Sequence, residues 1–190
     1  MRITSLAHEQ WSKIVSPGDT VIDATCGNGQ DMLALAQLLN GQGELIGYDI
    51  QKEALQKSEE RLKKSLTPDQ LQIITFRHQS HETFLEKSAK LIVYNLGYLP
   101  GGDKSLTTQT VTTLQSLQSA CGVIIPGGTI SVMCYVGHEE GKREEEAVRE
   151  FVQTLPSDRW CCTHHRIINR QQAPSLLLIQ GLKSDRTISA

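Results

Sequence analysis

The chain has 190 residues, a formal net charge of −2 and 38% hydrophobic residues. This length suits one sizeable α/β domain and is short for two. A net charge near zero excludes a protein that coats nucleic acid by bulk positive charge, although it leaves room for a local basic patch. We therefore expect a single domain over residues 1–190, with an N-terminal helix within 1–16 and a flexible tail at 184–190.

The sequence predicts a cytoplasmic protein that does not enter a membrane. No segment approaches the ~20 continuous apolar residues that a membrane span requires. The first residues also lack the apolar core of a signal peptide. Five cysteines are an odd number, and three of them stand in apolar, strand-like contexts. Reduced thiols fit this pattern better than a disulfide framework.

Strands and helices alternate along the chain. The expected strands are 20–25, 44–50, 71–78, 90–95, a fifth strand after a Pro–Gly–Gly turn within 122–136, and a final pair at 160–168 and 175–182. The expected helices are 3–15, 27–39, 51–66, a short one at 82–89, one from about 107 to 120, and a charged one within 137–155. This order predicts an α/β fold with a mostly parallel seven-stranded sheet, helices on both faces and an antiparallel edge pair.

A glycine loop follows the first strand in the stretch DATCGNGQD, from Asp23 to Asp31. A dinucleotide site would have a third glycine where this chain has Met32, and a P-loop would end in a lysine that is absent. The third candidate ligand is S-adenosylmethionine. It has no phosphate and so needs no lysine, and an acid such as Asp23 can bind its α-amino group. Gly27 and Gly29 let the backbone approach a ligand closely, but by themselves they also fit a plain turn.

Asp49 strengthens the prediction of a nucleoside site. It ends the second strand, where an acid can accept hydrogen bonds from both ribose hydroxyls. It can equally cap the helix that begins near Gln51, and the two roles are compatible. In the loop after the third strand, Gln79 and Ser80 can hydrogen-bond an adenine edge.

We expect no metal site. His78 and His81 have a spacing that suits metal ligands, but no acid or cysteine joins them. We expect both to shape their loop, and a position of His81 near the substrate is the alternative. The pairs Cys161–Cys162 and His164–His165 fall in a strand, where neighbouring side chains point to opposite faces. The two side chains of a pair therefore cannot simply converge on one metal ion.

The fourth strand ends in the segment N-L-G-Y-L-P, residues 95–100. This segment resembles the Asn/Asp-Pro-Pro-Tyr motif of amino-methylating enzymes, and the whole order of motifs resembles class I S-adenosylmethionine-dependent methyltransferases. The segments DATCGNGQD, GYDIQ, NLGYLPGGDKSLTT, YVGHEEGKREEEAV and QQAPSLLLI together are similar to one small bacterial family of rRNA methylases. The likeness runs over nearly the whole chain.

The resemblance implies a Rossmann-like class I fold and S-adenosylmethionine as the cofactor. It also implies conversion of 5-aminomethyl-2-thiouridine to 5-methylaminomethyl-2-thiouridine at the tRNA wobble position, with the tRNA anticodon stem-loop as partner and a homodimer as the assembly. The runner-up acceptors are rRNA and a small-molecule amine. A rival from another class is a nucleoside-binding or RNA-binding module without catalysis.

The candidate residues fall into three groups by role. Those expected to bind the cofactor are Asp23, Thr25, Gly27, Asn28, Gly29, Asp31, Asp49, Gln51, Gln79, Ser80 and Asn95. Those expected in catalysis are Asn95, Tyr98 and Asp103. Those expected to bind the substrate are Leu96, Gly97, Pro100, Lys104, His138, Lys142 and Arg143.

Two assignments within these groups stay open. Asp103 can act on the amine, by accepting its proton or by holding it, or it can only start the next helix. Lys104 can contact a phosphate or have no such role. The helix after His138 is interpreted mainly as a solvated charged face, preceded by cations that can reach RNA phosphates. Arg166, Arg170, His164 and His165 can add to that surface.

Overall fold

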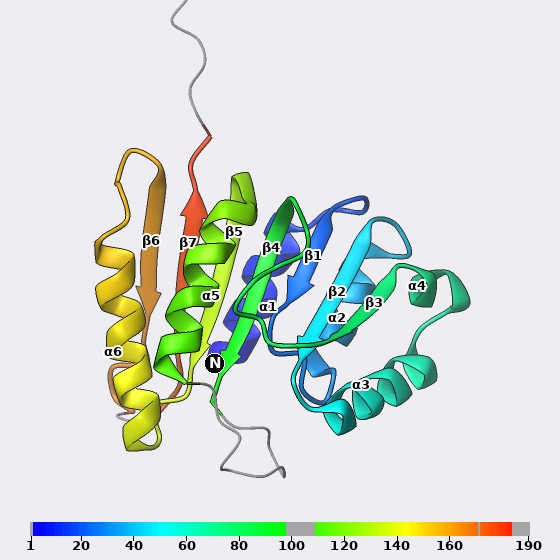
Figure 1. Ribbon diagram of the computed structural model, residues 1–190, viewed down its shortest axis with the longest axis horizontal. Helices are drawn as coiled ribbons and strands as arrows, with labels where there is room; N and C mark the ends of the chain where they lie inside the picture. Colours follow the sequence, from blue (N-terminus) through cyan, green and yellow to red (C-terminus); the bar gives the residue numbers. More distant parts are fainter. Residues whose placement is uncertain (1, 98–108, 171, 184–190) are drawn as a thin grey trace, which may run out of the picture.

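A computed structural model describes residues 2–97, 109–170 and 172–183. Seven strands form one sheet in the order β3-β2-β1-β4-β5-β7-β6 (Figure 1). Their bounds are β1 Thr20–Asp23, β2 Glu44–Asp49, β3 Ile74–His78, β4 Ala89–Leu96, β5 Ile124–Cys134, β6 Trp160–His165 and β7 Ser175–Gly181. The first five strands pair in parallel, and β7 pairs antiparallel with both β5 and β6. The predicted sheet is confirmed.

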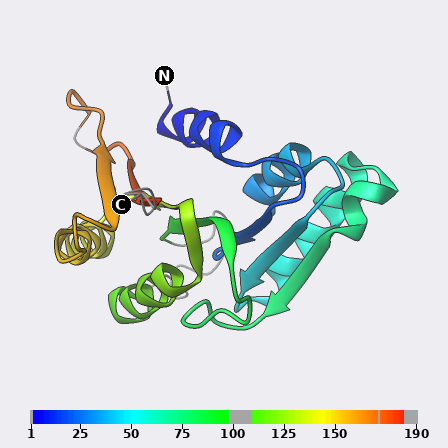
Figure 2. The same cartoon turned by 90° about the horizontal axis from the view of Figure 1, so that it is seen from above.

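Helices cover both faces of the sheet. They are α1 Ile3–Ile14, α2 Gln30–Leu39, α3 Lys52–Ser65, α4 Pro68–Gln72, α5 Thr110–Val123 and α6 Glu139–Gln153. Figure 2 shows α1 and α2 on one side of the sheet and α5 and α6 on the other. Alternate strand residues supply the two cores because successive side chains point to opposite faces. Val21 therefore packs with α1, α2 and α3, and its neighbour Ile22 packs with α5 and α6.

The strand order creates a topological switch point at the carboxyl ends of the strands, and this region is called the crevice below. The chain runs outward from β1 to β3 and then returns to β4 on the other side of β1. The carboxyl ends of β1 and β4 therefore meet where the order reverses, which is where ligands bind in open parallel sheets. In Figure 1 this edge is the lower one.

The prediction of a helix at 82–89 is wrong, because this segment forms turns and bends up to the start of β4. Tyr48 explains the difference. Its hydroxyl donates to Glu86 and accepts the backbone N–H of Leu85 at 3.2 Å, while its ring meets Phe84 edge-on at 5.4 Å. These contacts with β2 hold the segment in an irregular path, and local sequence does not reveal them.

Three smaller features also differ from expectation. The Pro–Gly–Gly segment is not a turn before the fifth strand but an irregularity within β5, where the pairing with β4 shifts and Gly127 takes a φ of +78°. The short helix α4 was not predicted. Its first residue is Pro68, and Thr67 and Gln70 form a capping box at its start. Helix α5 ends at Val123, three residues beyond the expected end.

In the described ranges, no helix is both long and apolar enough to cross a lipid bilayer.

Candidate active site

Asp49 ties the glycine loop to the end of β2. Its Oδ2 accepts the backbone N–H of Gly27 at 2.9 Å, and its Oδ1 accepts the backbone N–H of Gln51 at 2.8 Å. Gln51 is the N-cap residue of α3, so Asp49 helps to cap that helix, and its contact with ribose hydroxyls stays a prediction. Burial raises the pKa of Asp49, and these two backbone donors act against that rise.

Gly29 cannot carry a side chain in this fold. It is the N-cap residue of α2 and has a φ of +73°, which L side chains rarely adopt. A Cβ there would lie 2.2 Å from Ser58 Oγ and 2.8 Å from Ser58 Cα on α3. The glycine therefore serves helix packing as well as the turn beside the strand ends.

Asp23 stands at the carboxyl end of β1 and is only 1% exposed. Its Oδ1 accepts the backbone N–H of Thr25 at 3.1 Å, while its Oδ2 has no hydrogen-bond partner among the described residues. Burial raises the pKa of Asp23 well above its ordinary value, and the nearby carboxylates of Asp31 and then Asp49 add to the rise. This corner of the fold therefore favours a cationic ligand that carries hydrogen-bond donors.

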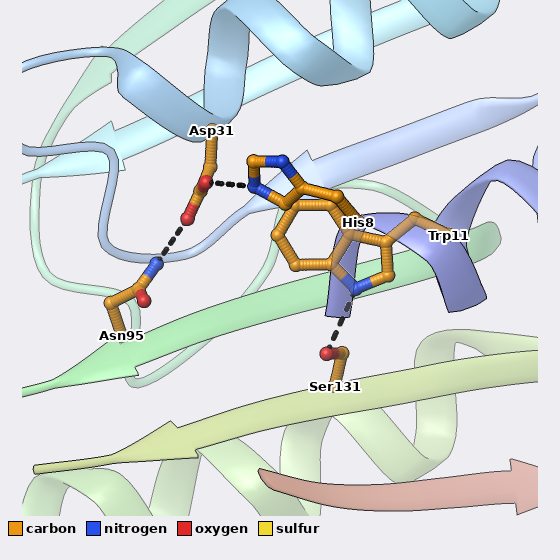
Figure 3. A network of polar contacts seen from close by, with 5 residues as sticks. All are labelled: His8, Trp11, Asp31, Asn95 and Ser131. Carbon is orange, nitrogen blue, oxygen red and sulfur yellow. Dashed lines mark hydrogen bonds and ion pairs between the residues drawn. The ribbon is translucent and has the colours of Figure 1, made fainter. Parts of the chain in front are cut away.

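A chain of polar contacts joins Asn95 to the first helix. Asn95 lies near the end of β4, where its backbone N–H donates to Thr25 Oγ1 at 2.7 Å and its Nδ2 donates to Asp31 Oδ2 at 2.6 Å. The other oxygen of Asp31 lies 2.6 Å from His8 Nε2 on α1 (Figure 3). Three segments that are far apart in sequence thus meet at the crevice.

The loop after β3 uses its polar groups locally. Ser80 Oγ accepts the backbone N–H of Glu82 at 3.3 Å, and the backbone N–H of Gln79 donates to the carbonyl of Arg77. His81 packs edge-on against the ring of Tyr94 at 5.8 Å, and burial lowers its pKa. These contacts fit the predicted loop-shaping role of His81, and the adenine contacts of Gln79 and Ser80 stay predictions.

The residues predicted to bind substrate divide between two places. Leu96 is a buried end of β4, and Gly97 follows it with a φ of +141°. His138 is the N-cap residue of α6, where its Nδ1 accepts the backbone N–H of Gly141 at 3.0 Å. Lys142 is exposed and pairs with Glu139 at 2.7 Å, and Arg143 is exposed beside it. An RNA contact by these side chains stays a prediction.

Four predicted residues lie outside the described part of the chain: Tyr98, Pro100, Asp103 and Lys104. Asn28 lies in the glycine loop, where its carbonyl accepts a hydrogen bond from Arg61 Nε at 2.8 Å.

All five cysteines are free thiols. Within 2–97, 109–170 and 172–183 no group of three or more His, Cys, Asp and Glu side chains could hold a metal ion.

Sequence reasoning missed two residues at this edge. His8 is one, and no motif in the first helix indicated it. The other is Tyr135, which directly follows β5 and is 38% exposed. Asp31 lies near enough to raise its pKa further, after the larger effect of burial. Its position after the strand that neighbours β4 was the available signal, since strand ends line the site.

Comparisons with known proteins bear on the family and the fold of the chain. Residues 45–180 match the family model described as "Putative rRNA methylase". The chain is 35% identical to an Arabidopsis thaliana protein named "tRNA (mnm(5)s(2)U34)-methyltransferase, chloroplastic", over 94% of this chain and 69% of that protein. A crystal structure of the same rRNA-methylase description from Clostridium thermocellum has a TM-score of 0.90 at 32% identity, covering 96% of this chain and 98% of the other.

A second solved structure carries a ligand. It is a "putative methyltransferase" from Streptococcus mutans in complex with S-adenosylhomocysteine (SAH). It has a TM-score of 0.83 at 29% identity, and the match covers 96% of this chain and 99% of the other.

Proposed function

Because this chain belongs to the rRNA methylase family and is an S-adenosylmethionine-dependent methyltransferase, we propose that its acceptor is the primary amine of 5-aminomethyl-2-thiouridine at the tRNA wobble position. The product is 5-methylaminomethyl-2-thiouridine. The observation that carries the proposal is the similarity over 94% of the chain to the Arabidopsis protein whose name states this nucleoside. Asn95, at the end of β4, supplies a fitting amine-binding group.

The acids of the crevice fit the cofactor. S-adenosylmethionine carries a sulfonium and an α-ammonium group, and it supplies the electrophilic methyl group of the reaction. The buried Oδ2 of Asp23 has no partner among the described residues, so an ammonium N–H there would remove the cost of leaving it unpaired. Asp49 retains lone pairs for ribose hydroxyls beside its two backbone donors.

The chain's own contribution to the reaction is mainly positioning. A neutral amine attacks a methyl sulfonium without acid catalysis, and holding two reactants in line can contribute about 7–11 kcal/mol. Asn95 would orient the nitrogen, and the carboxylate of Asp31, 2.6 Å from its amide, adds negative charge that attracts a cationic amine. The amine must release its proton before attack, because an ammonium has no lone pair.

Two arginines beside the crevice suit the phosphates of an RNA. Arg2 and Arg170 line a cleft of about 460 Å³ with mostly apolar remaining walls. The loop that contains Arg170 leads into Ser175, which pairs with Cys134 at the carboxyl end of β5, so the cleft lies at the same edge as the site. Tyr135, exposed at that edge, can stack on a base.

The proposal includes a homodimer in the cytoplasm. The five free thiols suit a reducing compartment. Light scattering of the purified protein tests the dimer directly, and a mass of one chain, 21.1 kDa, would contradict it.

An rRNA acceptor is the second candidate, because the description of the matching family names rRNA. One experiment separates the two. Purified protein and S-adenosylmethionine are incubated either with total tRNA from cells that lack the gene or with their ribosomal RNA, and nucleosides are measured by mass spectrometry. We expect 5-aminomethyl-2-thiouridine to disappear from the tRNA while 5-methylaminomethyl-2-thiouridine accumulates.

Methylated nucleosides in the rRNA alone would overturn the tRNA proposal in favour of rRNA. Transfer to neither RNA would contradict both acceptors. In the same preparation, tRNA binding measured between about 50 and 200 mM salt should weaken steeply, because phosphate contacts release counterions. A flat salt dependence would contradict these phosphate contacts.

A further inference from the structure

We infer that His8, on the N-terminal helix, is a positioning residue of the active site: it holds Asp31 and thereby fixes the side-chain amide of Asn95 with its oxygen toward the acceptor. The inference rests on the proposed methylation of an amine. It makes helix α1, which lies outside the strand-end motifs, a working part of the site.

The hydrogen-bond directions follow from the chemistry of the groups. His8 Nε2 lies 2.6 Å from Asp31 Oδ1. A carboxylate can only accept hydrogen bonds, so Nε2 of His8 must carry a proton in this contact. His8 thus holds one oxygen of Asp31 and leaves the other for Asn95.

The same argument fixes the amide of Asn95. Its Nδ2 lies 2.6 Å from Asp31 Oδ2, and only an N–H can face a carboxylate oxygen. In Figure 3 the amide nitrogen points at Asp31 and the amide oxygen points away from it. An isolated asparagine can turn over by half a rotation, whereas this one is committed to a single orientation.

Helix α1 is anchored firmly enough to impose this geometry. Ile3, Ala7 and Trp11 are buried against the sheet, each 5% exposed or less. Trp11 Nε1 donates to Ser131 Oγ on β5 at 2.9 Å, and the ring of His8 packs on Trp11 with centroids 4.7 Å apart (Figure 3). The sheet therefore positions the helix, and the helix positions His8.

The orientation of the amide matters for the reaction. An amide oxygen accepts an N–H of the amine and leaves the nitrogen lone pair free for attack on the methyl group. A reversed amide would instead donate its own N–H into that lone pair and compete with the transfer. Fixing Asn95 therefore selects an acceptor that presents an N–H and keeps its lone pair available.

Three variants test the inference by kinetics with saturating S-adenosylmethionine. His8→Phe keeps a ring against Trp11 but removes the N–H, whereas His8→Gln keeps an N–H at about the same reach. We expect kcat to fall about tenfold in His8→Phe, the scale of losing one charged hydrogen bond, and to recover in His8→Gln. The control Glu9→Gln changes an exposed neighbour on the same helix and should match the wild type.

Equal kcat values in wild type and His8→Phe would overturn the inference while the proposed function stands. Equal losses in the Phe and Gln variants, with melting temperatures that match the wild type, would also overturn it, because the N–H would then not be the relevant group.

A second measurement does not depend on the acceptor. The side-chain amide of Asn95, assigned by NMR, should show one strongly downfield proton bonded to Asp31, and this signal should shift in His8→Phe and return in His8→Gln. An unchanged Asn95 signal in His8→Phe would contradict the inference even if the proposed tRNA reaction failed. A shifted signal in a protein inactive on tRNA would instead contradict only the proposed function.

Discussion

Two groups of carboxylates can be compared within this molecule. Asp23 and Asp49 stand at the carboxyl ends of β1 and β2, and Glu144 and Glu145 stand on the inner face of α6. Burial is similar for three of the four, with Asp23 at 1%, Glu144 at 4% and Glu145 at 7% exposure, while Asp49 is half-buried. The hydrogen-bond partners differ. Side-chain hydroxyls approach the two glutamates, whereas the described part of the chain leaves one oxygen of Asp23 without any partner.

The glutamates hold α6 in place. Thr113 on α5 donates its hydroxyl to Glu144 Oε1 at 2.6 Å, and Ser175 at the start of β7 donates its hydroxyl to Glu145 Oε1. His164 Nε2 lies 3.2 Å from the same Glu145 oxygen. Each buried acid is thus used within the fold, so these groups stabilise the packing of the helix and leave little capacity for a ligand.

The strand-end acids have the opposite balance. Their pKa values are raised by burial, so the folded protein without ligand bears the cost of keeping them charged. Such local cost is typical of functional sites, where a ligand supplies the missing partner. The comparison therefore predicts that changes at α6 alter stability and changes at the strand ends alter cofactor binding.

The largest effect is expected for Glu145→Ala. Removing this acceptor leaves the buried hydroxyl of Ser175 unsatisfied, and we expect the free energy of unfolding to fall by about 2–4 kcal/mol. Urea unfolding measures the loss. Glu146→Gln, at an exposed position next to it, is the matched control and should change stability by less than about 0.5 kcal/mol. A stable Glu145→Ala variant with weakened S-adenosylmethionine binding would reverse the comparison.

A smaller effect is expected for Asp49→Ala, at the other group. Loss of charged hydrogen bonds to ribose hydroxyls should weaken S-adenosylmethionine binding by about 10–100-fold, or about 1.4–2.8 kcal/mol. Isothermal titration calorimetry measures the affinity, and Glu53→Gln, an exposed acid on the first turn of α3, is the control. Because Asp49 also holds the backbone of Gly27, Asp49→Asn is the companion variant. Unchanged affinity in both would exclude Asp49 from the cofactor site.

Much of this arrangement could be predicted from the sequence, and the exceptions have a common cause. The strands, the glycine loop and Asp49 follow from local pattern, since strand ends in a parallel sheet share one edge. His8 could not be predicted, because its partner Asp31 is 23 positions away and lies on another helix. Likewise, Glu144 and Glu145 share a buried helix face with Gly141 and Val148.

The interpretation of that helix as a solvated face was therefore wrong for these two acids. Their partners belong to α5 and β7, and a charged sequence does not indicate that a partner exists. The helix expected at 82–89 failed for the same reason, because contacts with Tyr48 decide its path. Periodicity along the chain does not report side-chain partners that are distant in the sequence.

The smallest expected effect is a gain in stability, in Asp23→Asn without ligand. Well below the ordinary Asp pKa of 3.8 the carboxyl is protonated in both states and its charge costs nothing. As pH rises from there toward the raised pKa of the folded state, the unfolded chain releases its proton first, so the wild type loses stability until that pKa is passed.

Asparagine cannot ionise, and the raised pKa of Asp49 remains in both proteins. The melting temperatures should therefore coincide at about pH 3 and below. They should differ by about 2–4 °C at neutral pH, or ~1 kcal/mol, with the variant higher. Saturating S-adenosylmethionine should reverse the order, because the ligand stabilises the wild type more. A variant that melts lower than the wild type at neutral pH without ligand would show that Asp23 serves the fold, as the glutamates of α6 do.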